Sequence, residues 1–175
     1  MILDVVKAAV LLFLAAVVQV AFVNSFELAE GHADIVLLAL VGLALLRGPV
    51  FGAAAGFFAG LVLDTGTFGT LGLSSLLLTL AGYAAGRLGE ATSHHKNQRA
   101  RILVAVMLLT AGVEIGSLVV HTLLGEPVSV GLIVVRVLLP ALALNVILAI
   151  PSYWACRRLF PPPPKRERER EVAVV

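Results

Sequence analysis

Two charged side chains lie inside long apolar stretches of the sequence, and these residues are the strongest candidates for chemistry. Glu114 comes twelve residues before Glu126, and Arg136 comes ten residues after it. Because Gly125-Glu126-Pro127 is typical of a turn, the flanking segments should form an antiparallel hairpin with both charges at similar depth. A lone charge in lipid is costly, so we expect an ion pair that either fixes the hairpin or takes part in function.

Two further polar side chains lie in the same apolar stretches. His121 follows Glu114 by seven residues, which puts both on one face of a helix. It can join the charged pair or face the outer interface. Asn145 needs a hydrogen-bonding partner, which we expect on another helix.

A stripe of small residues recurs every four positions and ends in a carboxylate, at Gly48, Gly52, Gly56, Gly60 and Asp64. Small residues let helix backbones approach closely, so the stripe predicts a packing face. Its neighbour is either another helix of this chain or a partner helix. Asp64 either caps the loop that follows, by accepting backbone N–H groups, or binds something at the outer end of the helix.

Several other chemistries lack their motifs. The sequence contains no phosphate-binding Gly-x-x-x-x-Gly-Lys-Ser/Thr loop, no Cys-x-x-Cys and no His-Glu-x-x-His. His94 and His95 are adjacent in a basic segment, which makes a poor metal site. Cys156 is the one cysteine, so no internal disulfide can form and we expect a buried or interfacial thiol. The sequence predicts no catalytic, cofactor-binding or metal site, and hence no enzyme.

The composition identifies the environment of the helices that hold these residues. Of 175 residues, 59% are hydrophobic and 14% are charged, whereas soluble domains carry about 25% charged residues. Too few polar residues remain to cover a water-facing surface. We therefore expect an all-α polytopic membrane protein. The small positive excess of charge does not indicate nucleic-acid binding.

Six apolar segments are long enough to be considered as transmembrane helices: Leu3–Asn24, Ala33–Leu46, Val50–Leu63, Leu71–Arg87, Ile102–Leu124 and Val128–Ala155. The second and third are short, so they could instead form one long helix with a defect at Arg47, which would give five spans. Short arms need thinned lipid, polar loops that dip inward, or shielding by neighbouring helices.

The distribution of charge favours six spans. With six, all segments rich in Lys and Arg face the cytoplasm, as the positive-inside rule requires, together with both termini. Residues 1–160 then form one six-helix transmembrane domain. Residues 161–175 are rich in proline and in charges of alternating sign, which predicts a disordered cytoplasmic tail.

Three patterns in the chain occur together: Arg47-Gly48…Gly52…Gly56-Phe57…Gly60-Leu61…Asp64…Gly69…Gly72, then Gly82-Tyr83, then Arg136…Pro140…Asn145…Pro151. Over about residues 1 to 160 they resemble the rod shape-determining protein MreD family. The resemblance implies a non-catalytic scaffold of the cell-elongation machinery in the bacterial inner membrane, which regulates cell shape and lateral peptidoglycan synthesis. It also implies a fold similar to the substrate-binding subunits of energy-coupling-factor transporters.

The same resemblance implies partners. Members bind the bitopic protein MreC, and through it connect MreB filaments to a peptidoglycan polymerase and transpeptidase. The alternative is a small-molecule-binding subunit of a membrane transporter. That alternative requires a polar, aromatic-lined pocket open to the outside, and aromatic residues make up only 6% of this chain.

Overall fold

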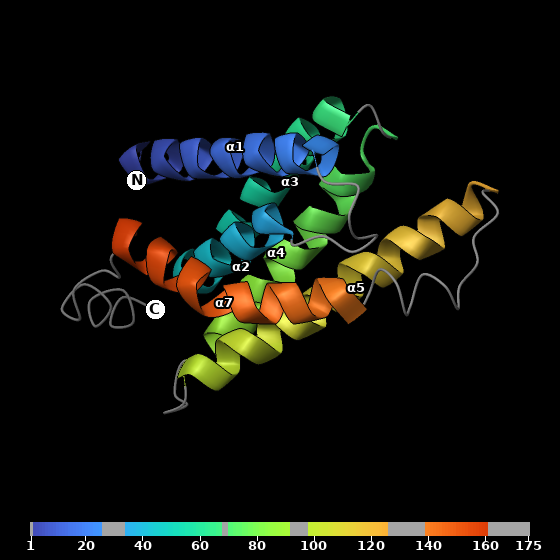
Figure 1. Cartoon of the computed structure of the whole chain (residues 1–175). Helices are drawn as coiled ribbons and strands as arrows, with labels where there is room; N and C mark the ends of the chain where they lie inside the picture. Colours follow the sequence, from blue (N-terminus) through green and yellow to red (C-terminus); the bar gives the residue numbers. More distant parts are fainter. Residues whose placement is uncertain (1, 26–33, 68–69, 92–97, 126–138, 161–175) are drawn as a thin grey trace.

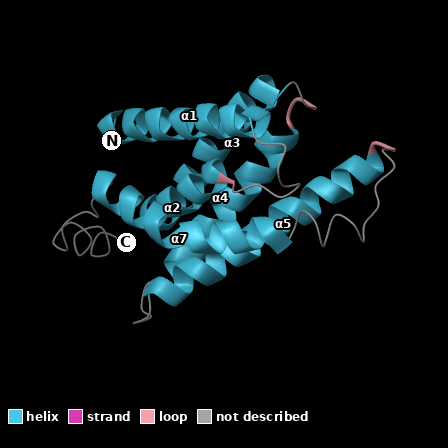
Figure 2. Ribbon diagram, in the orientation of Figure 1, coloured by secondary structure: helices cyan, strands magenta, loops and turns pink. Residues whose placement is uncertain are grey.

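The computed structural model describes residues 2–25, 34–67, 70–91, 98–125 and 139–160. Within these ranges the regular structure is entirely α-helical (Figures 1 and 2). The helices are α1 (Ile2–Ser25), α2 (Ile35–Arg47), α3 (Pro49–Thr67), α4 (Leu73–Ala91), α5 (Gln98–Leu123) and α7 (Leu139–Leu159). The expectation of an all-α protein is confirmed for the described residues.

Four of these helices are long and apolar enough to cross a membrane, at Leu3–Ala21, Pro49–Thr67, Ile102–Leu123 and Leu139–Leu159. Helix α2 has only 13 residues, or about 20 Å at 1.5 Å per residue, against a hydrocarbon core of about 30 Å. Helix α4 also has 19 residues but is not among these four. The described helices are therefore those of a multi-pass membrane protein.

Several helices begin or end a few residues away from the bounds that the sequence predicts. The third helix continues to Thr67, four residues beyond the predicted end, and the fifth begins at Gln98. The last helix continues to Leu159, whereas the predicted start of that span, from Val128, lies outside the described residues. Residues 161–175 also lie outside them, so the disordered tail stays a prediction.

Helices α2 and α3 are separate, so these residues do not form one continuous helix, and the choice between five and six spans stays a prediction. Gly48 ends α2 with a φ of 92°, a left-handed conformation that glycine adopts without steric cost. Its N–H donates to the carbonyl of Ala44 at 2.8 Å, and Pro49 begins the next helix. Proline suits the first helical position because no N–H is needed there.

The short helix α2 lies at the centre of the bundle and contacts α1, α3, α4, α5 and α7. Nine consecutive residues, from Val36 to Ala44, are buried. A helix that is apolar on all sides has to be covered on all sides. The neighbouring helices shield α2 from the surroundings, and Figure 1 shows it enclosed between α1, α4 and α7.

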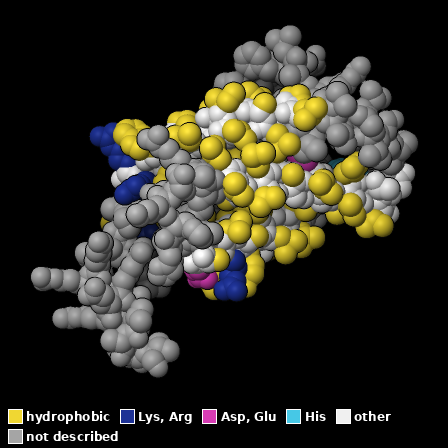
Figure 3. All heavy atoms as spheres, turned by 90° about the horizontal axis from the view of Figure 1, so that it is seen from below, with side chains coloured by type: hydrophobic (Ala, Val, Ile, Leu, Met, Phe, Trp, Pro, Cys, Tyr) yellow, Lys and Arg dark blue, Asp and Glu magenta, His cyan; other side chains and the backbone are white. Residues whose placement is uncertain are grey.

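The outer surface of the bundle is apolar. Every described helix except α2 exposes large hydrophobic side chains, among them Phe58, Leu80 and Ile147. Figure 3 shows such side chains over most of the described part of one face, with Lys and Arg toward its left side and lower edge. Such an exterior is stable against lipid tails and not against water.

Candidate functional site

Polar groups in the described core serve the ends of helices. Four polar or charged residues are buried there: Asp64, Ser75, Thr110 and Asn145. Within lipid, the free N–H groups of a helix's first turn have no water to bind, so other protein groups must accept their hydrogen bonds.

Asp64, on α3, caps the first turn of α4. Only 2% of its surface is exposed. Its carboxylate accepts hydrogen bonds from the backbone N–H groups of Gly72 at 2.8 Å, Ser74 at 3.0 Å and Ser75 at 3.3 Å, and from the Ser75 hydroxyl at 3.2 Å. A negative charge at a helix N-terminus is also favoured by the helix dipole. The carboxylate thus performs the capping role, and it presents almost no surface to a ligand.

The N-terminus of α2 receives hydrogen-bond acceptors from two different helices as well as from its own cap. Asp34 is the N-cap, and its carboxylate accepts from the N–H of Leu37 at 2.9 Å. The side-chain oxygen of Gln19, on α1, accepts from the N–H of Val36 at 2.9 Å. Gln19 was not predicted as a site residue, because its only signal in the sequence is a polar side chain within an apolar segment.

Asn145, on α7, completes the same helix end and is fully buried. Its Oδ1 accepts from the N–H of Asp34 at 2.9 Å, and its Nδ2 donates to the hydroxyl of Thr110, on α5, at 3.1 Å. The sequence predicts a partner for Asn145 on another helix, and the structure provides two. One side chain thereby joins α2, α5 and α7.

The glycine stripe of α3 lies against α4, within the chain. A Cβ atom added at Gly52 would lie closer than 3.0 Å to the backbone of Gly82, and one added at Gly56 would lie equally close to the backbone of Leu78. A Cβ at Gly60 would meet the first turn of α4 in the same way. A partner helix on this face would have to displace α4.

Two glycines of α4 lie on the other side of the same close contact. A Cβ at Gly82 would meet the backbone of Gly52, and one at Gly86 would meet the backbone of Pro49. Such approach maximises van der Waals contact between helices that gain nothing from excluding water in lipid. Gly112, on α5, differs from these, because a Cβ there would meet nothing within 4 Å.

The opposite end of α2 is held by an ion pair. The guanidinium of Arg47 donates to the carboxylate of Asp4, on α1, at 2.8 Å, and lies 5.6 Å from the ring centroid of Phe160, beyond the end of α7. Cys156 is buried, with its Sγ 3.7 Å from the carbonyl oxygen of Ala39. The start of α1, the end of α2 and the end of α7 therefore lie together.

Only one member of the predicted Glu114–Arg136 pair lies within the described residues. Glu114 and His121 both lie on α5, and each is partly exposed. Arg136 lies outside the described residues. The Glu114–Arg136 ion pair therefore stays a prediction.

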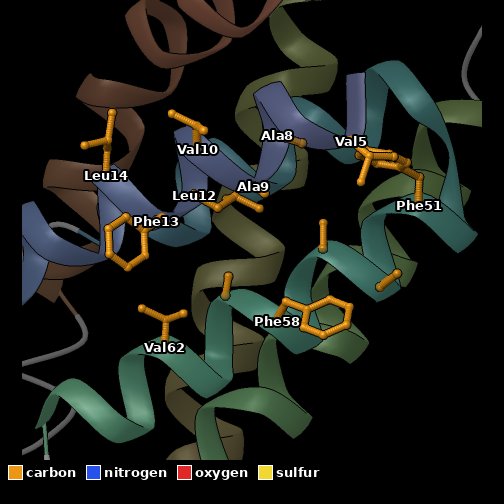
Figure 4. Close-up of a pocket in the computed structure, with 13 residues that line it drawn as sticks. Val5, Ala8, Ala9, Val10, Leu12, Phe13, Leu14, Phe51, Phe58 and Val62 are labelled. Carbon is orange, nitrogen blue, oxygen red and sulfur yellow. The ribbon is translucent and has the colours of Figure 1, made fainter. Parts of the chain in front are cut away.

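An apolar groove of about 600 Å³ lies between α1 and α3 (Figure 4). Side chains of α1 line one side of it and side chains of α3 line the other, and every lining residue is apolar. Five of the lining residues are alanines, and the larger ones include Phe13, Phe51 and Phe58. Sequence reasoning missed this groove because it depends on how α1 lies relative to α3.

The described residues contain no group of three or more His, Cys, Asp or Glu side chains that could hold a metal ion. Their arrangement defines a multi-pass helical membrane protein whose buried polar groups secure helix ends. A family model for the rod shape-determining protein MreD matches residues 1–160. The chain belongs to the MreD family, and its role is in the determination of rod shape.

No curated protein and no solved structure matches the chain. The similarity to substrate-binding subunits of energy-coupling-factor transporters therefore stays a prediction. Membership of the family confirms the resemblance that the Gly48–Asp64 pattern indicates in the sequence.

Proposed function

We propose that this chain is a non-catalytic scaffold of the bacterial inner membrane that binds the transmembrane helix of an MreC-like bitopic protein. Through that partner it connects MreB filaments to a peptidoglycan polymerase and transpeptidase. Family membership supports a role in cell shape. The observation that supports helix binding is the apolar groove between α1 and α3.

The position and lining of the groove favour a helix from another membrane protein as its occupant. The groove lies between two helices that are apolar and long enough to span the membrane, so whatever fills it is within the lipid. Small side chains such as Ala9, Ala54 and Ala55 allow a partner backbone to come close. The wall formed by α3 runs from Phe51 to Val62, roughly 17 Å of helix, which accommodates about three turns of a partner.

We also propose six spans with both termini in the cytoplasm. Arg47 joins the start of α1 to the ends of α2 and α7 through Asp4 and Phe160. Arg87 is in the last turns of α4, whose Gly86 packs on Pro49, so it lies at this end too. Positively charged residues at one end of the bundle support a cytoplasmic location for that end.

The alternative function, a small-molecule-binding subunit of a transporter, requires polar groups that recognise a solute. The α1–α3 groove has only apolar lining residues. Asp64 and Asn145, which are buried in the described core, already hydrogen-bond helix ends. These features favour the scaffold over the transporter subunit.

Photo-crosslinking in the membrane tests the scaffold proposal. A photoreactive residue at Phe58 or Ala54, in the groove, is expected to crosslink to the transmembrane helix of a coexpressed MreC-like protein. The matched control is Ile147 on α7, which is 70% exposed and does not line the groove, and it should give no such product.

Each other result has a defined meaning. Crosslinks between two copies of this chain would make the groove a self-association surface. Crosslinks to lipid alone, or equal products from Phe58 and Ile147, would overturn the assignment of the groove to the partner. A copurifying MreC-like protein that crosslinks only elsewhere would preserve the scaffold role and reject this surface.

A further inference from the structure

Helices α1 and α3 meet at one end and are separated by the apolar groove farther along. A Cβ atom added at Gly66, near the end of α3, would lie 3.1 Å from the side chain of Val20, on α1, so the two helices are close there. Toward the other end, the part of α1 from Val5 to Leu14 lines the hollow of about 600 Å³ (Figure 4). The groove is therefore a gap between two helices that meet beyond it.

Such a gap between two apolar helices in lipid needs a cause. Helices in lipid gain van der Waals contact by approaching each other, and small side chains allow close approach. Both walls carry such side chains, among them Ala9 on α1 and Ala54 and Ala55 on α3. A hollow also leaves the atoms that line it without contacts on one side. Interactions outside the groove must therefore fix the position of α1.

Two polar contacts tie α1 to the central helix α2, one at each end of α2. Arg47, the last residue of α2, donates to the carboxylate of Asp4 at 2.8 Å. Val36, in the first turn of α2, donates its N–H to the side-chain oxygen of Gln19 at 2.9 Å. Asp4 and Gln19 are fifteen residues apart, or roughly 22 Å of helix. The stretch of α1 that lines the groove lies between these two contacts.

Both contacts resist a movement of α1 toward α3. The hydrogen bond between Arg47 and Asp4 is charge-assisted, and the two side chains are only 23% and 28% exposed. The N–H of Val36 is buried, and no water in lipid can replace an acceptor that it loses. Closure of the groove would stretch these hydrogen bonds, so the two contacts oppose it.

We propose that Asp4, Arg47 and Gln19 are positioning residues that hold α1 away from α3 and so keep the groove open for the partner helix. None of the three lines the groove, so they act through the placement of α1 and not by contact with the occupant. The identity of the occupant rests on the proposed function. The position of α1 is a property of this chain, and it is measurable without a partner.

The distance between α1 and α3 tests this role. Nitroxide labels are placed at Val6 on α1 and Val50 on α3, in a C156A background, because these side chains are 52% and 79% exposed and neither lines the groove. Double electron–electron resonance measures their separation in the full-length protein, in nanodiscs without a partner. D4A removes the acceptor of Arg47 and is expected to shorten the mean distance, because α1 is released to close on α3.

The charge exchange D4R/R47D restores an opposite pair and should recover the native distance, which general loosening of the bundle would not allow. The matched control is E90Q, which removes the exposed ion pair of Arg87 within α4 and should leave the distance unchanged. The double variant D4A/Q19L loses both contacts and should shorten the distance more than D4A does. An unchanged or longer distance in D4A, or no recovery in D4R/R47D, would overturn the proposal.

Crosslinking to the partner completes the test. The product between a photoreactive residue at Phe58 and a coexpressed MreC-like protein is expected to fall severalfold in D4A and to return in D4R/R47D. A shortened distance with undiminished crosslinking would overturn the positioning role in partner binding. No crosslink in the native protein, with the distance still shortened by D4A, would reject the proposed partner and support the role of Asp4 and Arg47 in holding the groove open.

Discussion

Asp34 and Asn145 are 111 positions apart in the chain, yet the backbone N–H of Asp34 donates to the side-chain oxygen of Asn145 at 2.9 Å. This hydrogen bond joins the start of the central helix α2 to α7. The N–H groups in the first turn of this short helix need hydrogen-bond acceptors, and in a membrane protein the protein itself has to supply them. Gln19 and the carboxylate of Asp34 supply two further acceptors, for the N–H groups of Val36 and Leu37.

The substitution N145L is expected to destabilise the protein strongly. It keeps the number and branching of the heavy side-chain atoms but leaves the N–H of Asp34 and the hydroxyl of Thr110 without this partner. Each buried group left unsatisfied costs about 1–3 kcal/mol. Thermal unfolding of the purified protein should show a clear fall in stability for N145L and a smaller one for T110V, which loses a single hydrogen bond. Equal stability of N145L and the native protein would contradict the structural role of Asn145.

The glycine stripe of α3, where it packs on α4, is expected to tolerate no side chain. In G56A the new methyl group would collide with the backbone near Leu78, so the helices would have to separate. Overpacking of this kind costs about 1–3 kcal/mol. The matched control is G112A, where the methyl group meets nothing within 4 Å and higher helix propensity should stabilise by about 0.5–1 kcal/mol. Denaturant or thermal unfolding that ranked the two variants in the reverse order would show that α3 and α4 do not pack through this face.

The carboxylate of Asp64 is expected to hold the first turn of α4 in place. Removal of a helix-capping side chain costs about 0.5–2 kcal/mol. D64A should therefore increase hydrogen exchange at the amides of Gly72, Ser74 and Ser75, which donate to this carboxylate. S75A removes only one hydroxyl contact and should change exchange less. Unchanged protection of all three amides in D64A would show that these hydrogen bonds do not hold the first turn.

Glu114 and Arg136 are expected to pair across a helical hairpin. Single charge reversals, E114R and R136E, should each destabilise the protein, because one charge is then placed beside another of the same sign. The double reversal restores an opposite pair and should recover most of the lost stability. A double-mutant cycle of thermal stability measures this coupling. If the two effects simply add, the residues do not interact.

Part of the structure could be predicted because it depends on local composition. The apolar segments at Leu3–Asn24 and Ile102–Leu124 correspond closely to helices α1 and α5. Gly48-Pro49 predicts a break, and the positive φ of Gly48 produces one. These features follow from hydrophobic length and backbone sterics, which act over a few neighbouring residues.

The contacts of the candidate site could not be predicted in this way. A glycine stripe shows that something packs closely, but it does not show which helix. Gln19 and Thr110 are single polar residues in apolar helices, and the need of the α2 N-terminus for acceptors becomes visible only in the assembled bundle.

The sequence alone determined that this chain is a helical membrane protein, because in lipid its apolar segments can satisfy their backbone hydrogen bonds in few other ways. Its glycine and polar patterns also determined the resemblance to the MreD family. The tertiary structure decided which helix lies at the centre, which face of α3 meets α4 and where the α1–α3 groove opens. Helices in lipid select their neighbours by close packing and by the few hydrogen bonds between them. Those interactions join residues such as Asp34 and Asn145 that are far apart in the chain, so only the three-dimensional arrangement specifies them.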